Sequence, residues 1–179
     1  MIREIKGRKL KEVYSEKQIA GKVRELAGRI RADYEGKDPI LIGALKGAFI
    51  FLADLVREIP FPVQVEFVRL SSYRNGMEPG DLDVLLDLTI PVKGRHVLIV
   101  EDIIDTGVTS VAIKNILLAR SPATLRICAL VDNPSKRRVQ IDADYVGFRH
   151  DDGFIVGYGT DWGEEGRNLR EIYVLEEEG

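Results

Sequence analysis

The chain has 179 residues, of which 45% are hydrophobic and 31% charged. This length can bury one core and is short for two ordinary domains, so we expect a single domain over residues 1–179. The formal net charge of −3 provides no basic excess, which disfavours nucleic acid as an obligate partner. The single cysteine, Cys128, excludes a disulfide framework and a cysteine metal site, and it fits a reducing cytoplasm. The charged N-terminus and the lack of a long apolar stretch predict neither a signal peptide nor a membrane helix.

Helix and strand patterns alternate from the start of the chain. Ser15, with Gln18 three residues later, has the capping-box arrangement and precedes apolar residues at helical spacing, which predicts an N-terminal amphipathic helix. The short apolar run 40–44 is typical of a buried parallel strand, and a helical pattern follows at 48–59. The β-branched run 63–70 predicts the next strand.

The second half continues the alternation. Residues 71–83 collect glycine, proline and polar residues and are expected to form a surface loop, followed by short strands around 84–90. A buried strand at 97–100 then leads through a glycine-containing turn into a helix at 111–119. Further strands are expected at 125–131, 145–148 and 154–158. Strands alternating with helices predict an α/β fold with a mostly parallel sheet covered on both faces, whose ligands bind at the carboxyl ends of the strands.

Acidic and small polar residues follow the strand at 97–100. Glu101 and Asp102 come directly after it, and the turn 105–109 opens the next helix. Backbone N–H groups and the positive dipole end of a helix N-terminus favour a phosphate, whereas carboxylates suit sugar hydroxyls and hard cations such as Mg²⁺. The sequence therefore predicts a ribose 5-phosphate site. Its expected contacts are Glu101, Asp102, Asp105, Thr106, Gly107, Val108 and Thr109.

The same segment fits the common nucleotide-binding motifs poorly. The turn lacks the Gly-Lys-Ser/Thr ending of a nucleotide-binding P-loop, and no G-x-G-x-x-G motif occurs in the chain, which disfavours triphosphate hydrolysis and dinucleotide binding. Glu101 and Asp102 could simply cap the next helix. Capping alone accounts poorly for two adjacent acids directly after four apolar strand residues.

The segment resembles the phosphoribosyl pyrophosphate motif of type I phosphoribosyltransferases, and its Glu-Asp-Ile-Ile-Asp-Thr-Gly form resembles the hypoxanthine-guanine branch. The resemblance covers most of the chain and continues, in the family's order, through residues 45–47, 71–73, 144–148, 154–158 and 161–167. It implies a twisted sheet flanked by helices as a core over about residues 36–150, with a small hood formed by residues 1–14 and 151–179.

The resemblance also implies an activity. It is the Mg²⁺-dependent transfer of 5-phosphoribosyl from phosphoribosyl pyrophosphate to N9 of a 6-oxopurine, which gives IMP or GMP and pyrophosphate in purine salvage. Asp105 would be the catalytic residue that handles the proton on purine N7. A carboxylate beside an oxocarbenium-like centre can stabilise positive charge and act as a base. Alternatively, Asp105 is a loop residue that accepts backbone hydrogen bonds.

The family binds pyrophosphate through backbone N–H groups of a Leu-Lys-Gly turn that contains a non-proline cis bond, which here would join Leu45 and Lys46, with Gly47 next. Arg137 and Arg167 match positions that contact pyrophosphate, as suits a guanidinium fork meeting an anion. Without the resemblance, the turn would be ordinary and both arginines would be surface charges.

The purine and metal contacts are likewise implied by resemblance. Phe154 would stack on the base and the backbone near Ile155 would read its edge, although a lone phenylalanine in an apolar run is usually part of the core. Asp161 would lie beside the purine and bind Mg²⁺ near the pyrophosphate, and the two acids at 101 and 102 are the other expected metal-binding residues. Ser72 and Tyr73 would belong to a loop that closes over the reaction.

One position departs from the family. After the fourth core strand the family usually has Leu-Asp-Lys, whose lysine donates to the purine 6-oxo group, whereas this chain has Asn133. An amide still donates through its NH₂ group but is shorter and uncharged. Asn133 is therefore expected as a base contact of changed strength, with Lys136 as a second possible donor, and the preference among hypoxanthine, guanine and xanthine stays open.

Two rival functions remain. A regulatory protein could keep the fold and bind phosphoribosyl pyrophosphate without catalysis, but it would need an added DNA-binding domain or a broad basic face. A transferase could also act on another base, such as adenine or a pyrimidine. The resemblance further suggests a homodimer or homotetramer.

Overall fold

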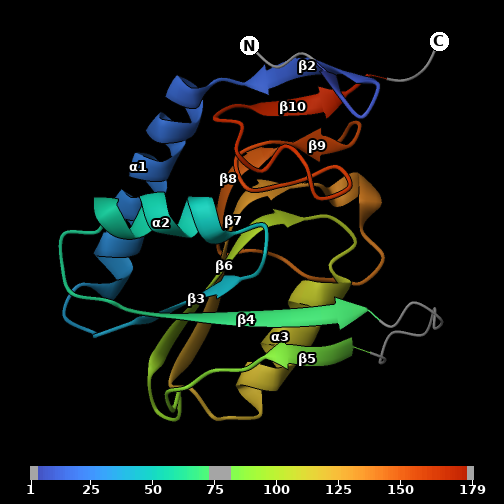
Figure 1. The fold of residues 1–179 in the computed structure, drawn as a ribbon. Helices are drawn as coiled ribbons and strands as arrows, with labels where there is room; N and C mark the ends of the chain where they lie inside the picture. Colours follow the sequence, from blue (N-terminus) through green and yellow to red (C-terminus); the bar gives the residue numbers. More distant parts are fainter. Residues whose placement is uncertain (1–3, 73–81, 177–179) are drawn as a thin grey trace.

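The computed structural model describes residues 4–72 and 82–176. Within these ranges the chain forms two sheets and three α-helices (Figure 1). The helices are α1 (Glu16–Tyr34), α2 (Phe49–Glu58) and α3 (Val108–Leu118), with a short 3₁₀ helix, η1 (Pro134–Lys136). The strands are β1 (Glu4–Ile5), β2 (Arg8–Tyr14), β3 (Ile40–Ala44), β4 (Gln64–Ser72), β5 (Leu82–Leu86), β6 (His96–Ile104), β7 (Thr124–Asp132), β8 (Tyr145–Arg149), β9 (Ile155–Val156) and β10 (Ile172–Leu175).

The larger sheet has the strand order β5-β4-β3-β6-β7-β8. Its pairings are parallel except for the edge strand β5, which runs antiparallel to β4. Successive side chains of β3 point to opposite faces of the sheet. Leu41 packs in the cluster that contains the apolar residues of α1 and α2, whereas Ile42 packs in the cluster that contains those of α3. Helices therefore cover both faces, which explains why the central strands are apolar throughout.

The smaller sheet, β1-β2-β10-β9, is called the hood below, together with the loops that join its strands. It brings the two ends of the described chain together, because β2 and β10 pair antiparallel (Figure 1). The hood has a small core of its own, made of Ile5, Leu10, Val156, Leu169, Tyr173 and Leu175. The α/β fold class with a mostly parallel sheet and a terminal hood is confirmed.

Most local expectations are confirmed with shifted boundaries, but residues 87–90 belong to no strand, and of the strand expected at 154–158 only Ile155–Val156 forms. Helix α1 begins at the predicted capping box, where the Gln18 N–H donates to Ser15 Oγ and the Ser15 N–H donates to Gln18 Oε1. Strand β6 extends beyond 100 to Ile104, because its parallel pairing with β7 continues past the acids, and α3 starts at Val108. Of the predicted loop 71–83, Ser71 and Ser72 belong to β4 and the last two residues to β5, while 73–81 lie outside the described residues.

Among the described residues, none of the helices has the length and apolar character needed to cross a bilayer.

Candidate active site

The carboxyl ends of β3 and β6 lie side by side, because the two strands pair in parallel with Gly43 opposite Val100. The turn after β3 therefore reaches the acids on β6. A Cβ atom added to Gly47 would lie 1.7 Å from Asp102 Oδ2, so only glycine allows this turn to pack directly on the carboxylate. The Leu45–Lys46 peptide bond in the same turn is cis, as predicted.

Glu101 is almost completely enclosed, with 4% of its surface exposed. Its Oε1 accepts a hydrogen bond from Ser110 Oγ at 2.8 Å, on the first turn of α3. Burial, followed by the neighbouring negative charge of Asp102, raises the pKa of Glu101 to about 8. Asp102 keeps part of its surface exposed, yet desolvation of the carboxylate raises its pKa to about 6, against an opposing hydrogen bond from the Ile103 N–H. The positive charge of Arg167 also lowers the pKa of Asp102, but burial outweighs it, so both adjacent carboxylates keep raised pKa values.

The turn 105–109 curves beside these acids. Gly107 precedes α3 with φ +81°, a left-handed conformation that favours glycine, and a Cβ atom there would lie 2.8 Å from Ile141 Cγ2. The Thr106 N–H donates to Asp105 Oδ1, so the Asp105 side chain also orders the turn. The Val108 N–H at the start of α3 donates to Thr106 Oγ1, so this turn leads directly into a helix N-terminus, a position that favours an oxyanion.

These groups line a small cavity of about 150 Å³. Its lining includes both acids, the turn after β3 and the start of α3. The lining residues are Ala44, Leu45, Gly47, Glu101, Asp102, Ile103, Asp105, Gly107, Thr109 and Ser110.

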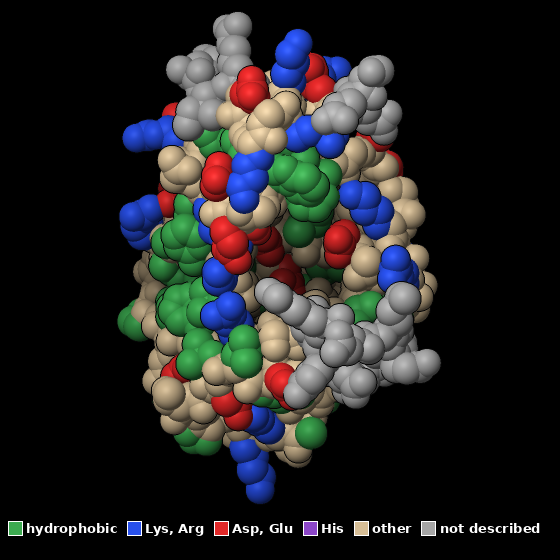
Figure 2. Space-filling view, turned by 45° about the vertical axis from the view of Figure 1, so that its right-hand side comes forward, with side chains coloured by type: hydrophobic (Ala, Val, Ile, Leu, Met, Phe, Trp, Pro, Cys, Tyr) green, Lys and Arg blue, Asp and Glu red, His purple; other side chains and the backbone are tan. Residues whose placement is uncertain are grey.

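A second cavity of about 240 Å³ adjoins the first and shares Gly47, Asp102, Ile103 and Asp105 with it. Its other side belongs to the hood and to η1, so the binding space lies between the sheet and the hood. Figure 2 shows acidic side chains deep in a hollow with lysine and arginine side chains around its rim. The remaining lining residues are Lys46, Lys136, Phe154, Ile155, Thr160, Asp161 and Arg167.

Phe154 offers an aromatic face at this second cavity, since 44% of its surface is exposed. Its ring meets Trp162 edge to face, with centroids 5.2 Å apart. Lys136 Nζ lies 5.7 Å from the Phe154 ring centroid and donates to the Gly153 carbonyl at 2.7 Å. An aromatic face beside a positive charge suits a flat, polar ring.

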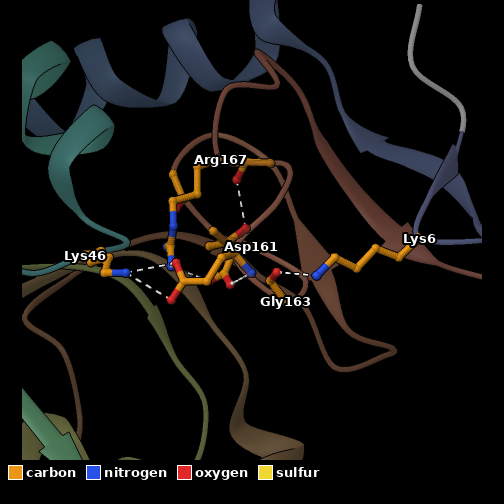
Figure 3. Close-up of polar contacts among 9 residues, drawn as sticks. Lys6, Lys46, Asp161, Gly163 and Arg167 are labelled. Carbon is orange, nitrogen blue, oxygen red and sulfur yellow. Dashed lines mark hydrogen bonds and ion pairs between the residues drawn. The ribbon is translucent and has the colours of Figure 1, made fainter.

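Cations and acids alternate at the mouth of the cavity (Figure 3). Lys46 Nζ lies 2.9 Å from Glu164 Oε2, and Arg167 NH2 lies 2.7 Å from Asp161 Oδ1. Arg167 NH1 also donates to the Gly159 carbonyl at 2.9 Å. Each of the two cations therefore has a carboxylate partner from the segment 161–164.

Two predicted contacts lie elsewhere. Arg137 pairs with Asp132, has its Cδ close to Gly107 and belongs to neither cavity lining. Asn133 is fully buried and belongs to neither lining; its Oδ1 accepts from Ser135 Oγ at 2.7 Å, and its Nδ2 has no hydrogen-bond partner among the described residues. Ser72 ends β4, and Tyr73 lies outside the described residues.

Some residues at the site carried little or no signal in the sequence. Ser110 follows Glu101 by nine residues, and its position on the first turn of a helix could have indicated a contact with the preceding strand. Glu164 and Thr160 lie in a turn-rich segment without periodicity, so nothing local predicted them. A further hollow of about 400 Å³ lies between α1, α2 and Tyr158, away from the acids and the phosphate turn.

Known proteins match this chain closely. Residues 9–162 match the phosphoribosyl transferase domain family. The hypoxanthine-guanine phosphoribosyltransferase of Aquifex aeolicus is 47% identical over 98% of this chain and 100% of that protein, and the hypoxanthine phosphoribosyltransferase of Haemophilus influenzae is 45% identical over 91% and 94%.

Solved structures agree with these matches. A hypoxanthine-guanine phosphoribosyltransferase from Bacillus anthracis has a TM-score of 0.89 and 42% identity, covering 93% of this chain and 98% of that one. The hypoxanthine phosphoribosyltransferase of Trypanosoma cruzi in complex with the product IMP also has a TM-score of 0.89, with 38% identity over 98% of each chain. The chain therefore belongs to the type I phosphoribosyltransferase family, in its hypoxanthine-guanine branch.

Proposed function

We propose that this protein is a purine salvage enzyme that transfers 5-phosphoribosyl from phosphoribosyl pyrophosphate to N9 of a 6-oxopurine, giving IMP or GMP and releasing pyrophosphate. One observation carries the proposal. Two adjoining cavities share Asp102 and Asp105, with a phosphate-binding turn on one side and paired cations and an aromatic face on the other. A nucleotide has its phosphate, sugar and base in this order.

The first cavity suits the ribose 5-phosphate. The phosphate would lie on the turn formed by Asp105, Thr106, Gly107, Val108 and Thr109, and the ribose hydroxyls would donate to Glu101 and Asp102. Hydroxyl donors and a cation would compensate two carboxylates whose pKa values are raised by desolvation.

The turn of Leu45, Lys46 and Gly47, together with Arg167, would hold the pyrophosphate. A guanidinium fork and an ammonium group are complementary to its charge. Arg137 would take part only after leaving Asp132, so we assign it to support of the phosphate turn in the described conformation.

Mg²⁺ is the expected cofactor. In the described part of the chain, no three His, Cys, Asp or Glu side chains converge on one metal position. Mg²⁺ usually keeps several waters and binds through one or two carboxylates plus substrate phosphates. We assign Glu101, Asp102 and Asp161 as its nearby acids, and bound Mg²⁺ would neutralise charge on the leaving pyrophosphate.

Asp105 would take the proton from purine N7, because it lines both cavities and so lies between the sugar and base sites. Phe154 would stack on the base and the Ile155 backbone would read its edge. Lys136, which lines the second cavity, is the first candidate donor to the 6-oxo group; Asn133 would reach the base only after a rearrangement, because it is buried outside both linings. Ser72 and Tyr73 would belong to the closing loop, and we further propose a cytoplasmic homodimer or homotetramer.

A spectrophotometric assay tests the activity. The purified chain is incubated with phosphoribosyl pyrophosphate and Mg²⁺ and with hypoxanthine, guanine, xanthine, adenine or uracil in turn. We expect turnover with hypoxanthine or guanine, and loss of turnover when EDTA removes the metal. Activity with adenine or uracil alone would assign another base, and binding of phosphoribosyl pyrophosphate without turnover of any base would favour a regulatory role.

A further inference from the structure

The Glu164 carboxylate lies between the two cations assigned to pyrophosphate. Its Oε1 and Oε2 are 3.0 and 2.9 Å from Lys46 Nζ, and Oε2 is 3.1 Å from Arg167 NH2 (Figure 3). Lys46 and Glu164 are 118 residues apart in the sequence, so the fold alone brings them together. An anionic side chain thus already occupies the donors that an incoming diphosphate would use.

The Glu164 backbone is held in place for this contact. Its N–H donates to Asp161 Oδ2 at 2.8 Å, and the residue adopts a left-handed conformation with φ +71°. The short turn from 161 to 164 thereby directs an acid back toward the cavity mouth. A freely rotating surface glutamate would have no such backbone restraint.

We propose that Glu164 is an internal counter-ion that the substrate diphosphate displaces, so that this residue sets the affinity of the site for pyrophosphate and for phosphoribosyl pyrophosphate. The inference rests on the proposed function, because it takes Lys46 and Arg167 as the pyrophosphate ligands. The proposed reaction does not say what the Lys46 and Arg167 side chains contact before the substrate binds, and the inference concerns this contact.

Displacement is energetically accessible. The Glu164 and Lys46 side chains are 66% and 43% exposed, and ion pairs at such positions contribute little to stability. Arg167 is only 21% exposed and keeps its bonds to Asp161 and to the Gly159 carbonyl when Glu164 leaves, so its guanidinium stays oriented. Lys46 Nζ has no other hydrogen-bond partner among the described residues and can turn to the diphosphate.

The test uses Glu164→Gln in the full chain, with isothermal titration of pyrophosphate in Mg²⁺ buffer. The amide keeps the size of the side chain and removes the competing charge. We expect the Kd for pyrophosphate to fall about three- to tenfold, since two weak pairs no longer compete. The KM for phosphoribosyl pyrophosphate should fall in parallel, while the Kd for IMP, which carries no pyrophosphate, should stay within about twofold.

Glu165→Gln is the matched control. Glu165 is the next residue, is 59% exposed and pairs with Lys6 at 3.8 Å rather than with either pyrophosphate ligand. It loses the same single charge, so a change below about twofold is expected if the effect at Glu164 is local. Equal effects of both variants would mean that the change in net charge alone alters the affinity, and this would overturn the inference.

Two outcomes separate this inference from the proposed function. If Lys46→Met weakens pyrophosphate binding but Glu164→Gln leaves it unchanged or weakens it, the counter-ion role is wrong and the pyrophosphate site stands. If Lys46→Met and Arg167→Gln both leave pyrophosphate affinity unchanged, the pyrophosphate assignment itself is wrong.

Discussion

Glu101 combines a carboxylate with near-complete burial, which makes its ionisation unfavourable. Its single described side-chain hydrogen bond, from Ser110, compensates only part of the lost hydration. A protein keeps such a group where a ligand completes its environment, and the neighbouring Asp102 shows the same tendency at lower burial. The unfavourable free energy of burying these two carboxylates therefore lowers the stability of the protein without ligand.

This cost predicts how stability depends on pH. The pKa of Glu101 is raised from 4.5 to about 8 in the folded state, so its stabilising contribution is complete below pH 4.5 and is lost as the pH rises to about 8. Glu101→Gln removes the charge and should therefore raise the Tm of the metal-free protein by about 3–8 °C at pH 8.5, but by little at pH 5. Differential scanning fluorimetry in EDTA measures both values. A Tm difference that is independent of pH would contradict the burial argument.

Asp105 is assigned to proton transfer, and its side chain also accepts the Thr106 N–H. Asp105→Asn keeps an oxygen that can accept the Thr106 N–H but removes the catalytic base, so kcat with hypoxanthine should fall by about 10²- to 10⁴-fold. The Kd for IMP should change by less than about threefold, because IMP binding requires no proton transfer to Asp105. Asp142→Asn, an exposed acid outside both cavities, is the control. Unchanged turnover would exclude Asp105 from the reaction.

Among the secondary-structure elements, the turn after β3 depends most on a single contact. Parallel pairing of β3 with β6 places Gly47 against the Asp102 carboxylate, leaving no space for a methyl group. The turn and the acid therefore hold each other in position. Strand register in the central sheet thus decides the geometry of the proposed pyrophosphate site.

Gly47→Ala should separate the turn from Asp102. We expect the Kd for pyrophosphate to rise at least about tenfold and the free energy of unfolding to fall by about 1–3 kcal/mol, because the added Cβ would overlap Asp102 Oδ2. Titration calorimetry and urea unfolding measure the two effects. Gly21→Ala makes the same change inside α1, where nothing lies within 4 Å, and should stabilise slightly or leave both values unchanged. Wild-type pyrophosphate affinity in Gly47→Ala would show that the contact is dispensable.

Across the whole molecule, the binding space exists because the hood closes over the carboxyl ends of the sheet. Phe154, Asp161 and Arg167 come from the hood side, whereas Asp102 and Asp105 come from the sheet side. Strand β10 links the hood residues of the site to the N-terminal strand β2, since it pairs with both β2 and β9. The stability of the hood should therefore influence base binding.

Leu10→Ala tests this coupling, because Leu10 is a buried residue of β2 in the hood core. The loss of its side chain should lower the free energy of unfolding by about 2–4 kcal/mol and weaken IMP binding several-fold. The control is Leu118→Ala, whose side chain is 49% exposed at the end of α3 and should have small effects on both. Unfolding curves in urea and calorimetry with IMP are the measurements. Unaltered IMP affinity in a destabilised Leu10→Ala protein would show that the hood core and the site are independent.

The sequence by itself determined that the acids near the end of β6 and the turn before α3 lie together. The acids at 101 and 102, the turn 105–109 and the start of α3 are contiguous, so local rules for strands, turns and helix N-termini were sufficient to predict them. The capping box of α1 and the apolar central strands were predictable for the same reason. The short strands β9 and β10 have too few residues for a periodic pattern to establish their pairing.

Only the tertiary structure decided which distant residues meet. It placed Gly47 against Asp102 and set Glu164 between Lys46 and Arg167. It also put Lys136 beside Phe154 and buried Asn133 outside both cavity linings. These contacts depend on strand register and on how the hood closes. Both follow from summed packing over the whole chain, because local periodicity fixes which face of an element is apolar but not which partner covers it.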